Sequence, residues 1–231
     1  MTPPEIIVAL DYSTHQAALK MASQLNPAHC KLKVGKELFT RSGPDIIKAL
    51  HQQGFDIFLD LKYHDIPTTV AKACFAAAEL GVWMMNVHVL GGEKMMRAAK
   101  EAIVSSGHDS LLIGVTLLTS MDQSTFEQLG FRGSLSDKVQ HLATMAADCA
   151  LDGVVCSAHE AAVLKRLIPK PGFHLVTPGI RLSTDSHDDQ HRIMTPIQAK
   201  QAGSDYLVIG RPITAAADPL QAVAAIRCGL S

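Results

Sequence analysis

The chain contains 231 residues, of which 47% are hydrophobic and 5% aromatic, and it carries 21 basic and 22 acidic side chains. This length suits one large domain, with enough apolar side chains for a single, mainly aliphatic core. The balanced charge and the lack of a Lys/Arg run give no electrostatic footprint for a nucleic acid polymer or an anionic membrane. No apolar run reaches the roughly 18 residues of a membrane span, so no membrane partner is predicted.

The cysteines and the first residues indicate the cytoplasm. The five cysteines are scattered without a C-x-x-C pair, which is typical of free thiols in a reducing compartment. The start "MTPPEIIVALD" lacks the basic region and the long apolar region of a secretory signal peptide. We therefore expect a cytoplasmic protein.

Short apolar or β-branched runs recur along the chain and predict buried strands. Eight such runs lie at residues 6–10, 31–34, 56–60, 84–89, 111–118, 153–157, 174–178 and 206–210. Ala-rich segments with helical periodicity lie between them, for example residues 68–81 and 138–153, and several end in Gly. Near-continuous apolar strands that alternate with helices are typical of a parallel sheet covered on both faces.

Eight strand–helix units in 231 residues predict a single (β/α)8 TIM barrel, with residues 1–231 as one domain. A doubly wound open sheet is the alternative. No linker, repeat or low-complexity stretch indicates a second domain. The polar segments near residues 119–136 and 181–192 are predicted to be loops that follow strands, and such loops form the catalytic face of a barrel.

The stretch "FLDLKYHDIPTTV" places Asp60, Lys62 and Asp65 within six residues, at the end of a predicted buried strand. Burying one charge costs several kcal/mol even after relaxation, so such a cluster persists only where its members compensate one another. Because Asp60 and Lys62 are two residues apart in a strand, their side chains are expected to share one face.

Two further charged residues belong to the ends of neighbouring strands. Asp11 follows the first predicted strand, and Lys33 lies within the second. A buried ion-pair network that only fixes strand register would account for one Asp/Lys pair. Five charged residues at strand ends fit a catalytic site better.

Arginines follow the last two predicted strands. Gly210 allows close approach of the backbone, and Arg211 supplies a planar donor fork that suits a phosphate group after the eighth strand. Arg181 follows the seventh strand, and "DDQHRIMTP" adds Gln190 and Arg192. Ordinary loop polarity is the alternative interpretation of these last residues.

The histidines do not indicate a metal site. No H-E-x-x-H motif occurs, and His187 and His191, although four apart, fall in a predicted loop. The roles of His64 and His88, beside the predicted strand ends, stay open between hydrogen bonding and packing.

Together these motifs resemble orotidine 5′-phosphate decarboxylase in its bacterial form. The resemblance covers essentially the whole chain, and its most specific part is D-x-K-x-x-D at residues 60–65 with the following Ile-Pro, together with "LKVGKELF" and "YLVIGRPIT". It implies a TIM barrel that converts orotidine 5′-phosphate to uridine 5′-phosphate and carbon dioxide. This is the last step of de novo UMP synthesis, and the resemblance implies no metal and no organic cofactor.

The resemblance also implies roles for the charged residues. Lys62 would donate the proton to the ring carbon that loses its carboxylate, and Asp60 would lie near that carboxylate. Lys33 would bridge the charges and the ribose hydroxyls, and Asp11 would contact the ribose. Asp65 would reach into the site of a partner subunit, which implies a homodimer with composite sites.

The remaining substrate contacts are implied in the same way. Thr119 would meet the pyrimidine, whereas Arg181, Gln190, Gly210 and Arg211 would hold the phosphate end and its closing loop.

One position departs from the usual D-I-P-N-T pattern of the family, because Thr68 stands where Asn is usual. A threonine hydroxyl can still donate, accept or cap a helix. The departure weakens Thr68 as a substrate contact and leaves Thr69 as a predicted one.

Three other functions are less compatible with these residues. A sugar-phosphate β-keto-acid decarboxylase of the same superfamily needs a metal-binding carboxylate in the second strand, where Lys33 would repel Mg²⁺. A Schiff-base aldolase needs a lysine that loses its proton readily, and the carboxylates beside Lys62 oppose this. A phosphate-binding barrel without catalysis would have no use for a lysine between two aspartates.

Overall fold

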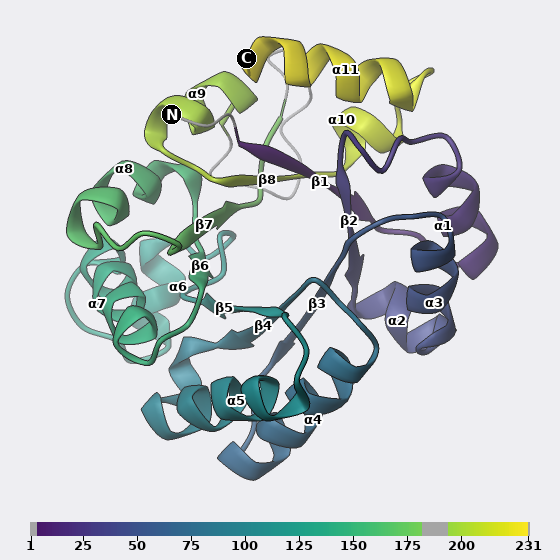
Figure 1. The fold of residues 1–231 in the computed structure, drawn as a ribbon. Coiled ribbons are helices and arrows are strands. Elements are labelled where there is room, and N and C mark those ends of the chain that lie inside the picture. Colours follow the sequence, from purple (N-terminus) through teal and green to yellow (C-terminus); the bar gives the residue numbers. More distant parts are fainter. Residues whose placement is uncertain (1–3, 182–193, 231) are drawn as a thin grey trace.

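Eight parallel strands close into a barrel in chain order, so that β8 pairs with β1 (Figure 1). The computed structural model describes residues 4–181 and 194–230. The strands are β1 (Glu5–Leu10), β2 (Lys31–Gly35), β3 (Ile57–Tyr63), β4 (Met84–His88), β5 (Leu111–Val115), β6 (Gly153–Val155), β7 (His174–Thr177) and β8 (Tyr206–Ile209). The predicted (β/α)8 barrel is therefore confirmed, and the open sheet is excluded.

Helices form the layer outside the barrel (Figure 1). They are α1 (His15–Ala22), α2 (Lys36–Ser42), α3 (Asp45–Gln52), α4 (Pro67–Glu79), α5 (Glu93–Ser106), α6 (Gln123–Gln128), α7 (Leu135–Asp148), α8 (Ala158–Leu167), α9 (Pro196–Ala202), α10 (Arg211–Thr214), α11 (Pro219–Leu230) and the 3-10 turn η1 (Val89–Gly91). Of the helices in the described part of the chain, none is long and apolar enough to cross a membrane.

Local sequence signals explain where several helices begin. Pro67 occupies the first turn of α4, where its missing N–H costs no hydrogen bond. The side chain of Ser157 caps α8, and Glu160 returns a hydrogen bond to the Ser157 N–H to complete a capping box. Both helices therefore start close to the carboxyl end of the preceding strand.

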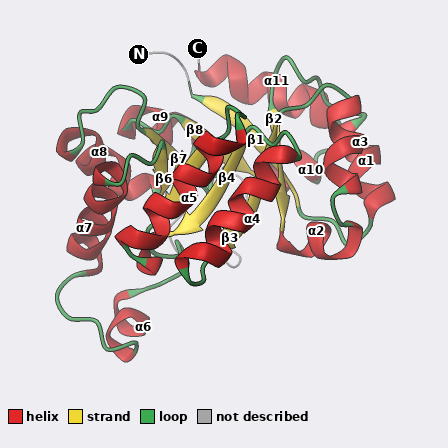
Figure 2. Cartoon of the chain, turned by 60° about the horizontal axis from the view of Figure 1, so that its bottom comes forward, coloured by secondary structure: helices red, strands yellow, loops and turns green. Residues whose placement is uncertain are grey.

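Several predicted boundaries are wrong, among them the end of the fifth strand, which was expected at residue 118 and lies at Val115. The segment 119–136 was expected to be a loop, but it contains α6, which Figure 2 shows at the lower edge of the molecule. The α6 side chain of Phe126 is fully buried and stacks on Phe131 with ring centroids 4.9 Å apart. The third strand also extends to Tyr63, beyond the expected end at residue 60.

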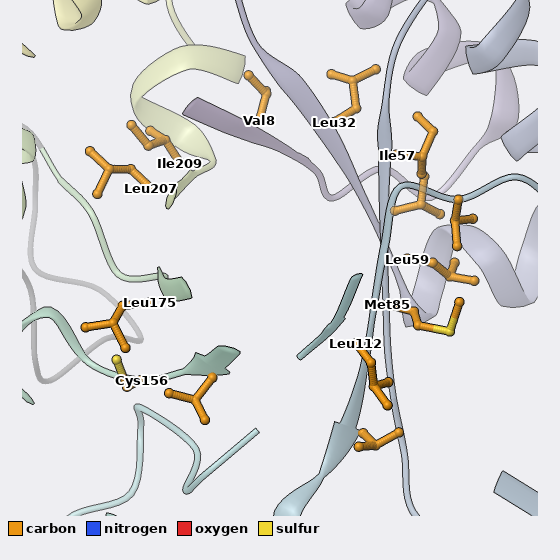
Figure 3. Packing of buried hydrophobic residues seen from close by; sticks show 14 of the residues in the cluster. Val8, Leu32, Ile57, Leu59, Met85, Leu112, Cys156, Leu175, Leu207 and Ile209 are labelled. Carbon is orange, nitrogen blue, oxygen red and sulfur yellow. The ribbon is translucent and has the colours of Figure 1, made fainter. Parts of the chain in front are cut away.

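The core has two parts because successive strand residues point to opposite faces. One part fills the barrel interior and includes Ile7, Ala9 and Phe58. The other lies between the strands and the helices (Figure 3). It includes Val8, Leu32, Ile57, Leu59, Met85, Leu112, Cys156, Leu175, Leu207 and Ile209.

Side chains from the first residues of the strands fill the amino end of the barrel. Trp83 packs edge-on against Tyr206, with ring centroids 5.1 Å apart. The Lys31 Nζ lies 4.4 Å from the centre of the Trp83 ring and 2.6 Å from the Asp56 carboxylate. Packed side chains thus occupy this end of the barrel in the described part of the chain.

Gly153 provides a test of strand packing in the barrel. A Cβ atom at this position would lie 2.1 Å from the backbone oxygen of His174, and a backbone atom cannot turn away as a side chain can. We expect Gly153→Ala to lower the free energy of unfolding by about 3 kcal/mol in urea denaturation. Gly229→Ala is the control, because its Cβ would only touch Ile197 at 3.8 Å. Equal effects of the two substitutions would contradict this account.

Candidate active site

Three neighbouring strands bring four charged side chains to the carboxyl end of the barrel. Asp11 directly follows β1, Lys33 lies in β2, and Asp60 and Lys62 lie in β3. Strand pairing sets Lys33 beside Ala9 of β1 and Asp60 beside Gly35 of β2. The predicted convergence of these side chains at one end of the barrel is therefore present.

The four side chains form a series of alternating charge, which we name the charge array. The Lys33 Nζ lies 3.3 Å from the Asp11 Oδ1 and 3.5 Å from the Asp60 Oδ2. The Lys62 Nζ lies 2.6 Å from the Asp60 Oδ1. Asp60 is thus shared between two ammonium groups, whereas each end of the array has one partner within it.

The environment of Asp60 favours its carboxylate form. Its side chain is only 13% exposed, and this burial acts to raise its pKa. The positive charges of Lys33 and Lys62, with hydrogen bonds from Lys62 and Asn86, outweigh burial and hold the Asp60 pKa below its usual value. The array therefore keeps a negative charge at its centre.

Asn86 of β4 is a site residue that the sequence analysis missed. Its Nδ2 donates to the Asp60 Oδ1 at 2.7 Å, and its Oδ1 accepts from the Lys62 backbone N–H at 2.7 Å. The sequence indicates this residue only as a single amide side chain within the apolar run "MMNVHV".

A cavity of about 620 Å³ opens beside the charge array. Its floor consists of apolar side chains from inside the barrel, and its rim carries polar and cationic groups. The apolar lining includes Ala9, Phe58, Val115, Val155, Val176 and Val208, and the rim includes Thr119, Ser120, Gly179, Arg181, Gly210 and Arg211. A cavity with one charged wall, an apolar floor and an arginine rim suits a flat ring that carries an anionic tail.

Two of the predicted site residues do not line this cavity. Asp65 and Thr69 are exposed and do not line it, and the Asp65 Oδ1 accepts from the Ile66 N–H at 2.6 Å. Gln190 lies outside the described residues. The other predicted contacts, Thr119 and Arg181 among them, do line it.

A smaller cavity of about 240 Å³ lies on the other side of the array. It shares Lys33 and Lys62 with the larger cavity and adds Lys36 and Glu37 of α2. A third cavity, of about 250 Å³, lies at the amino end around Lys31 and is remote from the array. Among these cavities, all lined by described residues, the two at the carboxyl end border the charged groups.

His88, whose role the sequence left open, has a ring packed near His64, with centroids 5.4 Å apart. Burial first, and then the positive charges of His64, Lys36 and Lys62, lower the His88 pKa to about 4. His88 is thus neutral at pH 7 and adds no charge near Lys62.

A closed (β/α)8 barrel whose carboxyl end holds buried ionic groups and an arginine-lined rim defines a class of TIM-barrel enzymes that act on small phosphorylated molecules. Residues 4–226 match the model of the family described as "Orotidine 5'-phosphate decarboxylase / HUMPS family". The chain belongs to this family, as its sequence motifs indicated.

Full-length relatives agree with this assignment. The chain is 56% identical over 230 residues to orotidine 5′-phosphate decarboxylase of Chromobacterium violaceum, covering 100% of this chain and 93% of the relative. It is 54% identical to that of Nitrosococcus oceani, covering 100% and 99%. The crystal structure of orotidine 5′-phosphate decarboxylase from Lactobacillus acidophilus superposes with a TM-score of 0.88 at 40% identity, covering 99% of each chain.

The lowered pKa of His88 predicts a pH dependence of stability. The unfolded chain binds a proton at His88 below pH 6.5, whereas the folded chain binds it only near pH 4. The stabilisation is therefore complete above pH 6.5 and is lost as the pH falls toward 4. We expect the wild type to lose about 1 kcal/mol more than His88→Gln between pH 7 and pH 5, in urea titrations. Equal losses would show that His88 is not responsible.

Proposed function

We propose that the protein decarboxylates orotidine 5′-phosphate to uridine 5′-phosphate and carbon dioxide, with Lys62 as the proton donor. Family membership and full-length relatives with this activity support the reaction. The observation that carries the assignment of roles is the Asp60 carboxylate between the Lys33 and Lys62 ammonium groups, on the wall of a cavity.

The chemistry follows from the charges. The bond between the ring carbon and the substrate carboxylate breaks, carbon dioxide leaves, and the electron pair stays on the ring carbon. The Lys62 ammonium stabilises this developing negative charge and then transfers a proton to the carbon. The resulting neutral amine recovers its proton from water.

Asp60 contributes through repulsion. Its carboxylate faces the region where the substrate carboxylate would sit, and two like charges at close range disfavour each other. This repulsion is relieved as the substrate group departs as neutral carbon dioxide. Asp60 also keeps Lys62 in place, because it holds the ammonium group at 2.6 Å.

The remaining residues would bind the nucleotide. The apolar floor and Thr119 receive the pyrimidine, and Asp11 and Lys33 face the ribose hydroxyls. The guanidinium groups of Arg181 and Arg211, at the rim, suit the phosphate. Phosphate contacts remote from the reacting carbon supply binding energy that orients the ring.

The polar loop residues complete this proposal. Gln190 is assigned to the phosphate end from its sequence position, and Gly210 lets the backbone approach the same group. Thr69, which does not line the cavity of its own chain, is assigned to the site of a partner subunit together with Asp65.

The reaction needs no metal ion or organic cofactor, because a fixed ammonium group supplies the positive charge. Lys33 occupies the β2 position at which a metal-dependent decarboxylase of this superfamily would need a carboxylate. The Lys33 ammonium would repel Mg²⁺ from this position, so we expect full activity in EDTA.

A homodimer with shared sites accounts for the exposed surface that follows β3. Asp65 and Thr69 are exposed there, and Ile66, at 63% exposure, and Leu90, at 40%, add apolar surface. The smaller cavity beside Lys36 gives the partner subunit's Asp65 a place near the array. The whole chain, residues 1–231, would act as one barrel domain in the cytoplasm.

The first test replaces the proton donor. With EDTA present, we expect the wild type to remove the orotate absorbance of orotidine 5′-phosphate. Lys62→Ala should do so at least about 10³-fold more slowly, because it lacks both charge stabilisation and proton transfer. Lys48→Ala is the control: this lysine has an exposed side chain on α3, and its substitution should leave the activity equal to that of the wild type. If the wild type is inactive but still binds uridine 5′-phosphate tightly, the protein is a binding barrel without catalytic activity.

The second test mixes two inactive variants. In a shared site, Lys62→Ala subunits supply Asp65, and Asp65→Asn subunits supply Lys62. Random exchange should then restore about a quarter of wild-type activity, because half of the dimers are mixed and each has one native site. If exchange is verified and activity stays at the sum of the separate variants, the site is complete within one subunit.

A further inference from the structure

Asn86 is a polar side chain buried among the apolar side chains of the barrel core. It lies in β4 between Met85 and Val87, which pack toward the helices, so its own side chain points into the barrel with those of Met84 and His88. Its exposure is 0%. A fully buried amide is costly unless its donors and acceptor find partners.

The partners of Asn86 are both members of the charge array. The Nδ2 group donates to the Asp60 Oδ1, and the Oδ1 atom accepts from the Lys62 backbone N–H, each at 2.7 Å. Only one orientation of the amide satisfies both, because the carboxylate can only accept and the backbone N–H can only donate. One side chain thus fixes two catalytic residues relative to each other.

The backbone at Lys62 needs such support. Lys62 has a φ of 53°, in the left-handed region, where a residue with a Cβ is disfavoured by roughly 1–2 kcal/mol. The pairing of β3 with β4 also shifts register between Leu59 and Tyr63. A bulge of this kind re-aims a side chain, and here the re-aimed side chain is that of Lys62.

We infer that Asn86 is a positioning residue for the proton donor: its amide holds the β3 bulge that aims the Lys62 ammonium and at the same time orients the Asp60 carboxylate. This inference rests on the proposed function. Asn86 does not line the cavity, so it acts through its two partners without contact with the nucleotide.

The first experiment compares Asn86→Ala with the wild type in the decarboxylation assay. A proton donor displaced by about 1 Å should lower kcat by about 100-fold. KM and the dissociation constant of uridine 5′-phosphate should change less than about threefold, since the phosphate rim is untouched. Thr116→Val is the control, because this buried hydroxyl only donates to the Val155 carbonyl; it should keep wild-type kcat.

The second experiment uses Asn86→Asp, which is nearly isosteric and keeps the acceptor for the Lys62 N–H. The new carboxyl group, buried beside Asp60, can donate to it only when protonated. We expect a raised pKa for this group, because burial and the neighbouring Asp60 carboxylate both oppose its ionisation. The ratio of kcat for Asn86→Asp to that of the wild type should therefore fall as the pH rises from 5 to 8.

The ratio isolates the new group because the other titratable neighbours are common to both proteins. These neighbours are Asp60 and Lys62 of β3, Lys33 of β2 and His88 of β4. A ratio that does not change with pH, or a kcat of Asn86→Ala equal to that of the wild type, would overturn the inference. So would a parallel loss of uridine 5′-phosphate binding, which indicates a general structural role. An inactive wild type would instead overturn the proposed function.

Discussion

The Asp60 carboxylate, held between two ammonium groups in a largely buried position, is the interaction on which the rest of the site depends. An unpaired charge in this place would cost several kcal/mol, so neither Lys33 nor Lys62 can be removed without a penalty on Asp60. The barrel makes this pairing possible because the carboxyl ends of adjacent parallel strands meet at one rim. The fold thus brings together groups that are far apart in the sequence.

The opposite end of the barrel uses charged pairs in a different way. Lys100 of α5 binds the Asp152 carboxylate at 2.6 Å, and Asp152 also accepts from the Leu112 backbone N–H. Lys165 of α8 binds Asp205 in the same manner. Each of these carboxylates ties a helix to the start of a strand, and neither lines the cavity beside the array. Pairs at the amino end therefore serve stability, whereas the array at the carboxyl end faces a cavity, as the proposed chemistry requires.

The sequence predicted the barrel because buried parallel strands leave apolar runs that recur with the helices between them. It did not predict α6, because "QSTFEQ" is short, polar and stabilised mainly by Phe126. The charge array was predictable since its members follow recognisable strands. The bulge at Lys62 was not predictable. The left-handed backbone conformation of this lysine accompanies a hydrogen bond to Asn86 on the neighbouring strand, a contact that the local sequence does not indicate. The place proposed for Asp65, in the site of a partner subunit, involves a second copy of the chain, which a single sequence does not describe.

The distribution of charge separates binding from reaction. The array has two positive and two negative members, so it is balanced within one subunit. Orotidine 5′-phosphate carries a phosphate and a carboxylate, and the cationic side chains of Arg181 and Arg211 line the same cavity as the array. In the proposed mechanism, the phosphate is attracted at a point where no bond changes. The substrate carboxylate lies near Asp60, and its departure relieves the repulsion between the two groups. Binding energy from the phosphate can thus offset the repulsion between the two carboxylates, and the proton that Lys62 is proposed to donate then replaces the departing carboxylate on the ring carbon.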